Sequence, residues 1–254
     1  MSLFDLTGKI AVITGSSRGI GRAIAEEMAA HGAKVVISSR KQNACEDVAR
    51  EIDDRHGKGT ALPIAASISS KDALKAMMDK VRSDRGPVDI MVCNAASNPY
   101  YGSMDGIEDD QFRKILDNNV LSNHWLCQMA LPDMRAKKDG AIVIVSSIGG
   151  LRGSDTIGAY NVSKAADFQL VRNYAVENGK HNIRINAIAP GVVKTDFARA
   201  LWEDEKVHDA TAARTPMRRL GEPRDIAGAA IYLSSQAGAW MTGQMMVVDG
   251  GITI

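Results

Sequence analysis

Short runs of β-branched and other apolar residues alternate along this chain with stretches of helical periodicity, and this alternation limits the fold more than any other feature. A strand–helix–strand order predicts an α/β doubly wound fold, with helices on both faces of one parallel sheet. Between the runs, apolar residues recur three and four positions apart, which predicts amphipathic helices. Seven runs are strand candidates: Lys9 to Thr14, Lys34 to Ile37, Ala61 to Ile64, Asp89 to Cys93, Ala141 to Val145, Ile183 to Ile188 and Met245 to Val248.

The length of 254 residues suits one large α/β domain. No repeat, low-complexity tract or Pro-rich linker divides the chain, so we expect a single domain over residues 1–254. Residues 191–220 have mixed character and include Phe197, Leu201 and Trp202. Long irregular segments often act as lids. We expect a substrate lid here, and a pair of surface helices that merely pack on the sheet is the alternative.

Charge and cysteine usage exclude several classes of function. The 31 Lys and Arg balance 30 Asp and Glu without a basic stripe, so neither nucleic acid nor a membrane surface is an expected partner. Three cysteines far apart in the sequence argue against disulfides, and the five histidines lack metal-ligand spacing, so no metal is expected. A start without signal-peptide character and apolar runs too short to cross a bilayer favour a cytoplasmic protein.

A glycine-rich turn follows the first strand candidate and leads into a helix. Glycines at this place allow a tight turn, close approach of the backbone to a pyrophosphate and close helix–strand packing. The free N–H groups of the helix start favour phosphate. A glycine cluster alone is weak evidence, but its position after the first strand predicts a dinucleotide site. The expected contacts come from Gly15, Ser17, Arg18, Gly19, Ile20 and Gly21.

The end of the second strand indicates which dinucleotide is bound. NAD-binding folds place an acidic residue there for the ribose 2′-hydroxyl, but this chain has Ser39, Arg40 and Lys41. Ser39 leaves room for a 2′-phosphate, and Arg40, with Lys41 and Arg18 nearby, can pair with it. NADP(H) is therefore favoured over NAD(H). The alternative is that Arg40 and Lys41 only form a solvated helix start.

Tyr160 and Lys164 lie four residues apart in a helical stretch and so share one helix face. A free tyrosine titrates near about 10, and a nearby ammonium lowers this by roughly one to three units. Such a phenol can exchange a proton with a carbonyl or alcohol oxygen. The strand ending at Val145 places the Ser147 hydroxyl at the carboxyl end of the sheet, where α/β folds hold ligands.

Taken together, these residues resemble the short-chain dehydrogenase/reductase family in its roughly 250-residue form. The resemblance covers nearly the whole chain and implies a Rossmann fold and an oxidoreductase acting on CH–OH or C=O groups. The matching positions, in order, are Thr14 to Gly21, Asn94-Ala95-Ala96, Asn119, Ser147, Tyr160 with Lys164, Pro190-Gly191 with Thr195, and Asp249-Gly250-Gly251.

The resemblance also implies residue roles. Tyr160 would be the general acid/base, Ser147 the hydroxyl that orients the carbonyl, and Lys164 the cation that lowers the tyrosine pKa and holds the nicotinamide ribose. Asn119 would anchor a water in a proton relay, and it is chosen over Asn118 because the family pattern has Asn followed by an aliphatic residue, here Val120. The family spacing to the tyrosine selects Ser147 over Ser146. Implied cofactor contacts include Ile68, Asn94, Ala95, Ala96, Tyr160, Lys164, Pro190, Gly191, Val193 and Thr195.

Two positions depart from the family pattern: Ala96 replaces a glycine, and Ser67 stands where an acid commonly meets the adenine. The segments around Asn98 to Gly102 and Arg219 to Pro223 are similar to NADPH-dependent carbonyl and retinal reductases. Tyr100, Tyr101 and Trp202 are substrate candidates, although paired aromatics after a strand often serve only loop packing. The resemblance implies a homotetramer. An NAD-dependent alcohol dehydrogenase and a non-catalytic dinucleotide-sensing scaffold are the alternatives.

Overall fold

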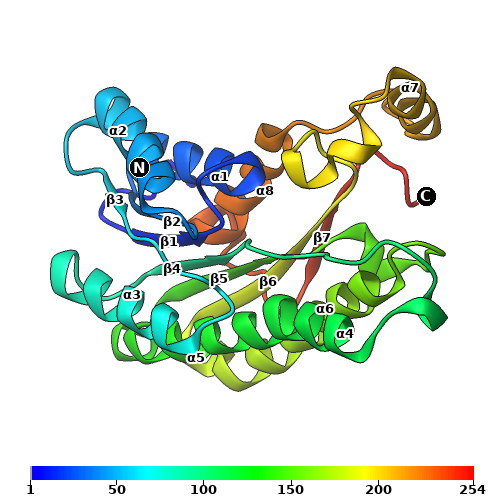
Figure 1. Cartoon of the computed structure of the whole chain (residues 1–254). Helices are drawn as coiled ribbons and strands as arrows, with labels where there is room; N and C mark the ends of the chain where they lie inside the picture. Colours follow the sequence, from blue (N-terminus) through cyan, green and yellow to red (C-terminus); the bar gives the residue numbers. More distant parts are fainter. Residues whose placement is uncertain (1) are drawn as a thin grey trace.

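The computed structural model describes residues 2–254, and the predicted seven-stranded parallel sheet is confirmed (Figure 1). The strand order is β3-β2-β1-β4-β5-β6-β7. The predicted strand bounds differ from the observed ones by two residues at most. The strands are β1 Ile10–Thr14, β2 Lys34–Ser38, β3 Ala61–Pro63, β4 Ile90–Cys93, β5 Gly140–Val145, β6 Ile183–Pro190 and β7 Met245–Val248.

Helices cover both faces of the sheet. Helices α1, α2 and α8 lie on one face, and α3, α5 and α6 lie on the other, with α4 beside α6 (Figure 1). Their bounds are α1 Gly19–Ala30, α2 Gln42–His56, α3 Lys71–Asp84, α4 Asp109–Leu116, α5 Ser122–Lys137, α6 Gly158–Asn178, α7 Glu205–Arg214 and α8 Pro223–Ser234. Within the described residues, no helix is long and apolar enough to cross a membrane.

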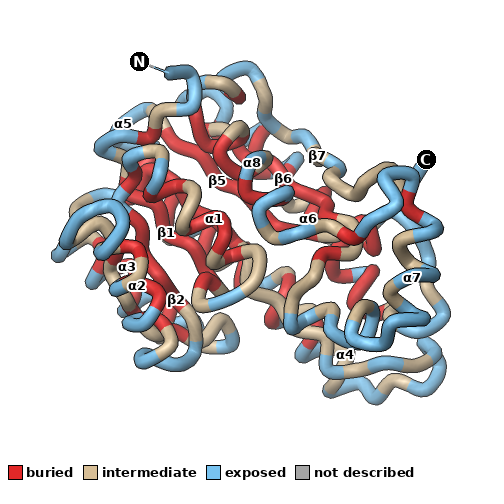
Figure 2. Tube along the Cα trace, turned by 90° about the horizontal axis from the view of Figure 1, so that it is seen from above, coloured by how far each residue is buried: buried red, intermediate tan, exposed pale blue. Residues whose placement is uncertain are grey.

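The central strands are buried on both sides, as a parallel sheet between two helix layers requires. Along β1, Ala11 and Ile13 enter the core under α1 and α8, whereas Ile10 and Val12 enter the core on the α3 and α5 side. Figure 2 shows the central strands buried, with exposure concentrated on the outer helices and loops. The continuous apolar runs in the sequence reflect this double burial.

The chain topology brings the candidate residues to one edge of the sheet. From β1 the strand order runs through β2 to β3 on one side and through β4 to β7 on the other, which creates a switch point between β1 and β4. Open α/β sheets bind ligands in the crevice outside the carboxyl ends of the strands at such a point. The glycine-rich turn follows β1, and Ser147 follows β5.

The expected lid segment contains more regular structure than its mixed sequence indicated. After β6 the chain forms the 3-10 helix η5, Asp196–Leu201, and then α7. Both stand above the carboxyl edge of the sheet, with the C-terminus beside them (Figure 1). The alternative of two surface helices describes the secondary structure correctly, and the position over the sheet edge agrees with a lid.

Candidate active site

The glycine-rich turn has the shape that a dinucleotide phosphate requires. Helix α1 begins at Gly19, where φ is +57°, and its first N–H groups have no intrahelical acceptor. A Cβ on Gly21 would lie 2.5 Å from the Gly15 carbonyl oxygen, so only glycine fits there. The Ser16 side chain donates to Ile13 O at 2.7 Å and accepts from Ser38 N at 2.9 Å, which fixes the turn to β1 and β2.

Asn94, expected beside the adenine ribose, also supports the turn. Its Nδ2 donates to Thr14 O at 2.9 Å and to Gly15 O at 3.2 Å. The backbone N–H groups of Asn94 and Ala95 donate to Thr14 Oγ1 at 3.0 and 3.2 Å. These hydrogen bonds join the residues that follow β4 to the end of β1. The sequence did not reveal this supporting role, because it depends on residues 80 positions apart.

The residues expected to read the 2′-phosphate lie at the start of α2. Arg40 and Lys41 are exposed, and within residues 2–254 neither forms an ion pair. The half-buried Ser39 places its Oγ 3.2 Å from Cys45 Sγ. Arg18, expected from the glycine-rich turn, instead pairs with Asp196 on η5 at 3.0 Å. Arg18 thereby links the cofactor turn to the lid segment.

Tyr160 and Lys164 are both buried near the start of α6. The Lys164 Nζ lies 5.7 Å from the centroid of the Tyr160 ring. The same Nζ donates to Val145 O at 3.1 Å and contacts Asp167 Oδ2 at 3.2 Å. The shared helix face that the sequence predicted is therefore present, and it includes a carboxylate that the sequence analysis did not single out.

Burial is the largest single influence on the pKa of each of these groups. It raises the pKa of Tyr160, and the nearby Lys164 ammonium and Ser147 hydroxyl only partly oppose this. For Lys164, burial acts to lower the pKa, but the charge and hydrogen bond of Asp167 together with Tyr160 and Cys93 outweigh burial, and the pKa is raised. The pKa of Asp167 is also raised by burial, against the effects of Lys164 and Asn123. Thus Lys164 remains an ammonium, and the isolated protein keeps Tyr160 protonated at neutral pH.

Ser147 and Asn119 adjoin this pair from two other elements. Ser147 begins the 3-10 helix η3, Ile148–Leu151, and its Oγ accepts from Gly149 N at 2.9 Å. Asn119 lies in η2, a π-helical segment at Asp117–Leu121 between α4 and α5. Its Oδ1 accepts from Ser97 N at 2.8 Å, and its Nδ2 donates to Ser163 Oγ at 3.0 Å. π-Helical insertions are frequent at functional sites.

The lid segment contacts the tyrosine directly. The rings of Phe197 and Tyr160 have centroids 5.8 Å apart. The Trp202 Nε1 donates to Thr195 O at 2.8 Å, so this substrate candidate is held against the start of η5. Thr195 also touches the cofactor turn, because a Cβ on Gly19 would lie 3.2 Å from its Cγ2. Thr195, in the segment expected to be a lid, therefore lies against the glycine-rich turn.

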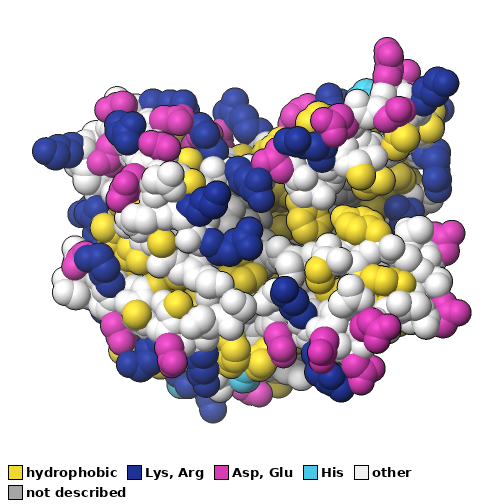
Figure 3. Space-filling model, in the orientation of Figure 1, with side chains coloured by type: hydrophobic (Ala, Val, Ile, Leu, Met, Phe, Trp, Pro, Cys, Tyr) yellow, Lys and Arg dark blue, Asp and Glu magenta, His cyan; other side chains and the backbone are white. Residues whose placement is uncertain are grey.

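The two tyrosines after β4 occupy different positions. The Tyr100 hydroxyl donates to Ser103 O at 2.9 Å within its own loop, which agrees with the loop-packing alternative. Tyr101 is exposed, and it lies near enough to Tyr160 to act on its pKa. Figure 3 shows a hollow below α7, and hydrophobic side chains line it. Exposed apolar side chains on the surrounding segments are Tyr101, Met104, Leu151, Phe197 and Leu201.

The remaining cofactor candidates follow the carboxyl ends of β3, β4 and β6. Ile68 packs against the sheet core in the loop after β3. Pro190 ends β6, and a Cβ on the next residue, Gly191, would lie 2.8 Å from Asp249 Cα. Val193 is buried and pairs with Gly221. Ala96 lies between Asn94 and Ser97 in the loop after β4. The Ser97 backbone N–H donates to Asn119 Oδ1.

Comparison with known proteins decides the family. A family model described as enoyl-(acyl carrier protein) reductase matches residues 15–253. Dehydrogenase/reductase SDR family member 4 of Oryctolagus cuniculus is 36% identical over 247 residues, which are 97% of this chain and 94% of that protein. The chain belongs to the short-chain dehydrogenase/reductase family. It is therefore an oxidoreductase acting on hydroxyl or carbonyl groups, and the family implies a nicotinamide dinucleotide cofactor.

Two solved structures of this family match the whole fold. A 7α-hydroxysteroid dehydrogenase in complex with NADH and 7-oxo glycochenodeoxycholic acid is 37% identical, with a TM-score of 0.91 over 98% of this chain and 95% of that one. A gluconate 5-dehydrogenase from Burkholderia cenocepacia in complex with NADP and tartrate is 31% identical, with a TM-score of 0.92 over 98% and 97%. Both cofactors thus occur on this fold.

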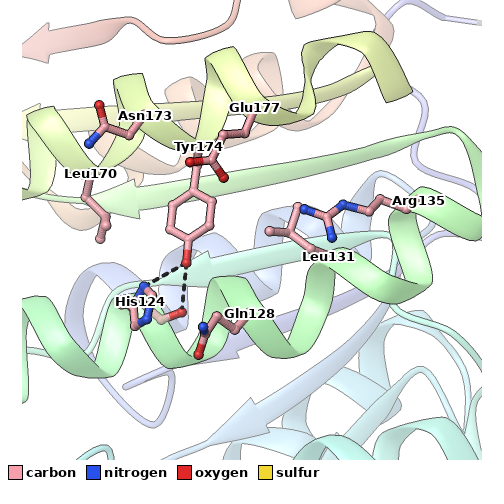
Figure 4. Close-up of a pocket in the computed structure, with 8 residues that line it drawn as sticks. All are labelled: His124, Gln128, Leu131, Arg135, Leu170, Asn173, Tyr174 and Glu177. Carbon is pink, nitrogen blue, oxygen red and sulfur yellow. Dashed lines mark hydrogen bonds between the residues drawn. The ribbon is translucent and has the colours of Figure 1, made fainter.

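A second hollow, which does not include Tyr160, lies between α5 and α6 (Figure 4). The Tyr174 hydroxyl lies 2.7 Å from His124 Nδ1 at its centre, and Arg135 and Glu177 stand at its edges. In the part of the chain that the structure describes, no group of three or more metal-ligating side chains assembles here or elsewhere.

Proposed function

We propose that this short-chain dehydrogenase/reductase transfers a hydride between NADP(H) and the carbonyl or alcohol carbon of a small organic substrate. The observation that carries the proposal is the buried Tyr160–Lys164 pair at the carboxyl edge of the sheet, beside Ser147 and below the Phe197 ring. In this proposal the Tyr160 phenol is the general acid/base. Ser147 orients the substrate oxygen, and Asn119 supports the relay behind Lys164.

The residues present fit the cofactor. The pyrophosphate would lie over the turn from Gly15 to Gly21, against the first N–H groups of α1. The nicotinamide would extend toward Tyr160 and Lys164, flanked by Val193 and Thr195. When bound, the nicotinamide supplies the hydride for reduction or accepts it in oxidation. The protein's own part is to position the substrate carbon and to move one proton at the Tyr160 hydroxyl.

The direction of the pKa shift shows how Tyr160 would serve each direction of the reaction. Because burial raises the pKa of Tyr160, the phenol holds its proton at neutral pH and can donate it to a carbonyl oxygen. Oxidation requires the phenolate, which the ammonium of Lys164 and the positive charge of an oxidised nicotinamide favour. Both directions use the same atoms, and the cofactor ratio then decides between them.

The apolar rim of the hollow supports a hydrophobic substrate. Phe197 lies against Tyr160, and Met104 and Leu151 are exposed on two neighbouring segments. Burying these side chains against an apolar substrate is favourable, whereas a polyhydroxy acid would leave its hydroxyls without partners there. In this proposal residues 191–220 act as the lid, and they close over the substrate.

A panel of carbonyl and alcohol substrates, assayed with NADPH and NADP⁺, tests the proposal. Aromatic ketones, steroid ketones and long aldehydes are expected to have higher kcat/KM than sugar acids of equal chain length. Turnover of sugar acids alone would contradict the apolar site. If no substrate is turned over while the dinucleotide still binds, the sensing-scaffold alternative would replace the enzyme proposal.

We also propose a cytoplasmic homotetramer. Cys45, Cys93 and Cys127 are buried free thiols, which suits a reducing compartment. Residues of α5 and α6 line the hollow of Figure 4, and α6 also exposes Val162 and Val176. The C-terminal region exposes Trp240 fully. Pairing by two-fold symmetry through both of these surfaces would produce a closed tetramer.

A further inference from the structure

A buried carboxylate beside Lys164 has no part in the reaction proposed above. The Asp167 side chain is completely buried, and its Oδ2 lies 3.2 Å from Lys164 Nζ. Burying two charges costs several kcal/mol of desolvation per ion, so such a pair adds little stability by itself. Lys164 lies one helical turn after Tyr160 and Asp167 lies two turns after it. The ammonium lowers the pKa of Tyr160 and the carboxylate raises it.

Asp167 limits the positions that the ammonium can take. A lysine ammonium has three donors. One of them points to Val145 O at 3.1 Å, and a second to Asp167 Oδ2. A third donor remains for the Tyr160 side, where the ring centroid is 5.7 Å away. The carboxylate and the β5 carbonyl thus hold the ammonium from one side and leave its reactive side free.

The carboxylate is itself held from α5. Asn123 Nδ2 donates to Asp167 Oδ1 at 2.9 Å and to the Asn119 carbonyl oxygen at 2.6 Å. This amide connects Asp167 to the same π-helical segment that supports the loop after β4. Asp167 is therefore held from α5 as well as by Lys164 on its own helix.

The other groups around Asp167 carry no compensating positive charge. From β5, Ser146 is near enough to lower the pKa of Asp167, and from β4 the buried Cys93 thiol faces the pair. From α6 itself, Tyr160 is the remaining titratable neighbour. Among the described residues in contact with Asp167, Lys164 is thus the cation that balances it.

We propose that Asp167 is a positioning residue for Lys164: its carboxylate anchors the ammonium, keeps it charged, and sets the pH range in which Tyr160 exchanges its proton. This proposal rests on the roles of Tyr160 and Lys164 given under the proposed function. A negative charge favours the protonated form of every acid and base near it. Removal of that charge therefore lowers the pKa of Tyr160 and of Lys164 together.

The test is Asp167→Asn, with the pH profile of kcat/KM for alcohol oxidation as the readout. Oxidation needs Tyr160 deprotonated and Lys164 protonated, so both limbs of the profile are expected to move to lower pH by roughly one unit. Asp167→Ser removes the same charge with less bulk, in case the amide is not accommodated. Asp167→Glu keeps the charge, so its profile should stay in place although its rate falls.

Unfolding of the cofactor-free protein gives a second readout. In Asp167→Asn the Lys164 ammonium is buried without its counter-ion, so its pKa falls below that of the unfolded chain, about 10.4. Above the lowered value the unfolded state binds more protons, and stability rises with pH. The deficit in Tm relative to wild type should therefore narrow between pH 7 and about pH 10. An equal deficit at every pH would overturn the proposal.

Tyr160→Phe, measured in parallel, separates this inference from the proposed function. If Tyr160→Phe remains active, the assigned roles fail, whatever Asp167→Asn does. If Tyr160→Phe is inactive and the charge-removing variants lose rate without moving either limb of the profile, the proposed function stands and Asp167 has only a structural role.

Discussion

Gly21 and Asn94 lie so close together that a methyl group on Gly21 would collide with the Asn94 side-chain amide. The same methyl group would lie 2.5 Å from the Gly15 carbonyl oxygen, to which Asn94 Nδ2 donates. The start of α1, the cofactor turn and the end of β4 are therefore packed around one hydrogen-bonded amide. Larger side chains at position 21 would separate these three segments.

Gly21→Ala is expected to weaken cofactor binding by tenfold or more and to destabilise the fold by about 1–3 kcal/mol, because the turn must shift to make room. Gly228→Ala is the matched control. Gly228 is exposed inside α8 with nothing near its Cβ position. Alanine there should raise stability by about 0.5–1 kcal/mol. Isothermal titration and thermal unfolding measure both effects, and unchanged affinity in Gly21→Ala would contradict the close packing.

The strands and the central helices could be predicted because their burial produces local patterns of apolar residues in the sequence. The continuous apolar run from Ile10 to Ile13 follows from a strand covered on both faces. The glycine-rich turn and the Tyr160–Lys164 spacing are also local. In contrast, the mixed sequence around η5 and α7 has few buried residues, so its periodicity gave no helical signal.

The supporting contacts of the site could not be predicted, because they join distant positions. Asn123 and Asp167 lie 44 residues apart and meet only when α5 packs beside α6. One local signal was available: Asp167 follows Lys164 by three residues and so shares its helix face. A carboxylate on that otherwise buried face needs a partner. The Arg18–Asp196 pair is 178 residues apart and had no such signal.

Tyr160→Phe is expected to remove nearly all turnover while the cofactor still binds, because only the transferable proton is lost. Tyr100→Phe is the control, since its hydroxyl bonds only to Ser103 O within the loop that follows β4. That variant should change kcat less than threefold, which corresponds to about 0.6 kcal/mol of activation free energy. If Tyr160→Phe retains more than about a tenth of the wild-type kcat, with chemistry rate-limiting, Tyr160 is not the acid/base.

Light scattering at micromolar concentration should report four copies of the chain. Val176 on α6 is 86% exposed and precedes Glu177, which lines the hollow between α5 and α6, as expected of a surface that a second copy covers. Val176→Asp would bury a charge in that interface, so it should dissociate the tetramer into smaller species. A wild-type protein that remains monomeric under these conditions would contradict the assembly.

The choice between NADPH and NADH depends on the start of α2. An acid at position 39 would repel a 2′-phosphate, whereas Ser39 does not, and the exposed Arg40 is free to donate two hydrogen bonds to it. Arg18 must leave Asp196 to contribute, but that ion pair is solvent-exposed and its loss costs little. We therefore expect a higher kcat/KM with NADPH than with NADH, and a preference that weakens as salt rises.

The double variant Ser39→Asp/Arg40→Ala tests this preference. It should reduce kcat/KM for NADPH on the order of a hundredfold and leave NADH nearly unchanged, because each charge-assisted contact contributes roughly 1.5–3 kcal/mol before screening. Arg50→Ala is the matched control: Arg50 lies further along α2 and pairs with Asp47. This control should leave the ratio of the two cofactors at its wild-type value. Equal losses with both cofactors in the double variant, or a wild-type preference for NADH, would show that Ser39 and Arg40 do not recognise the phosphate.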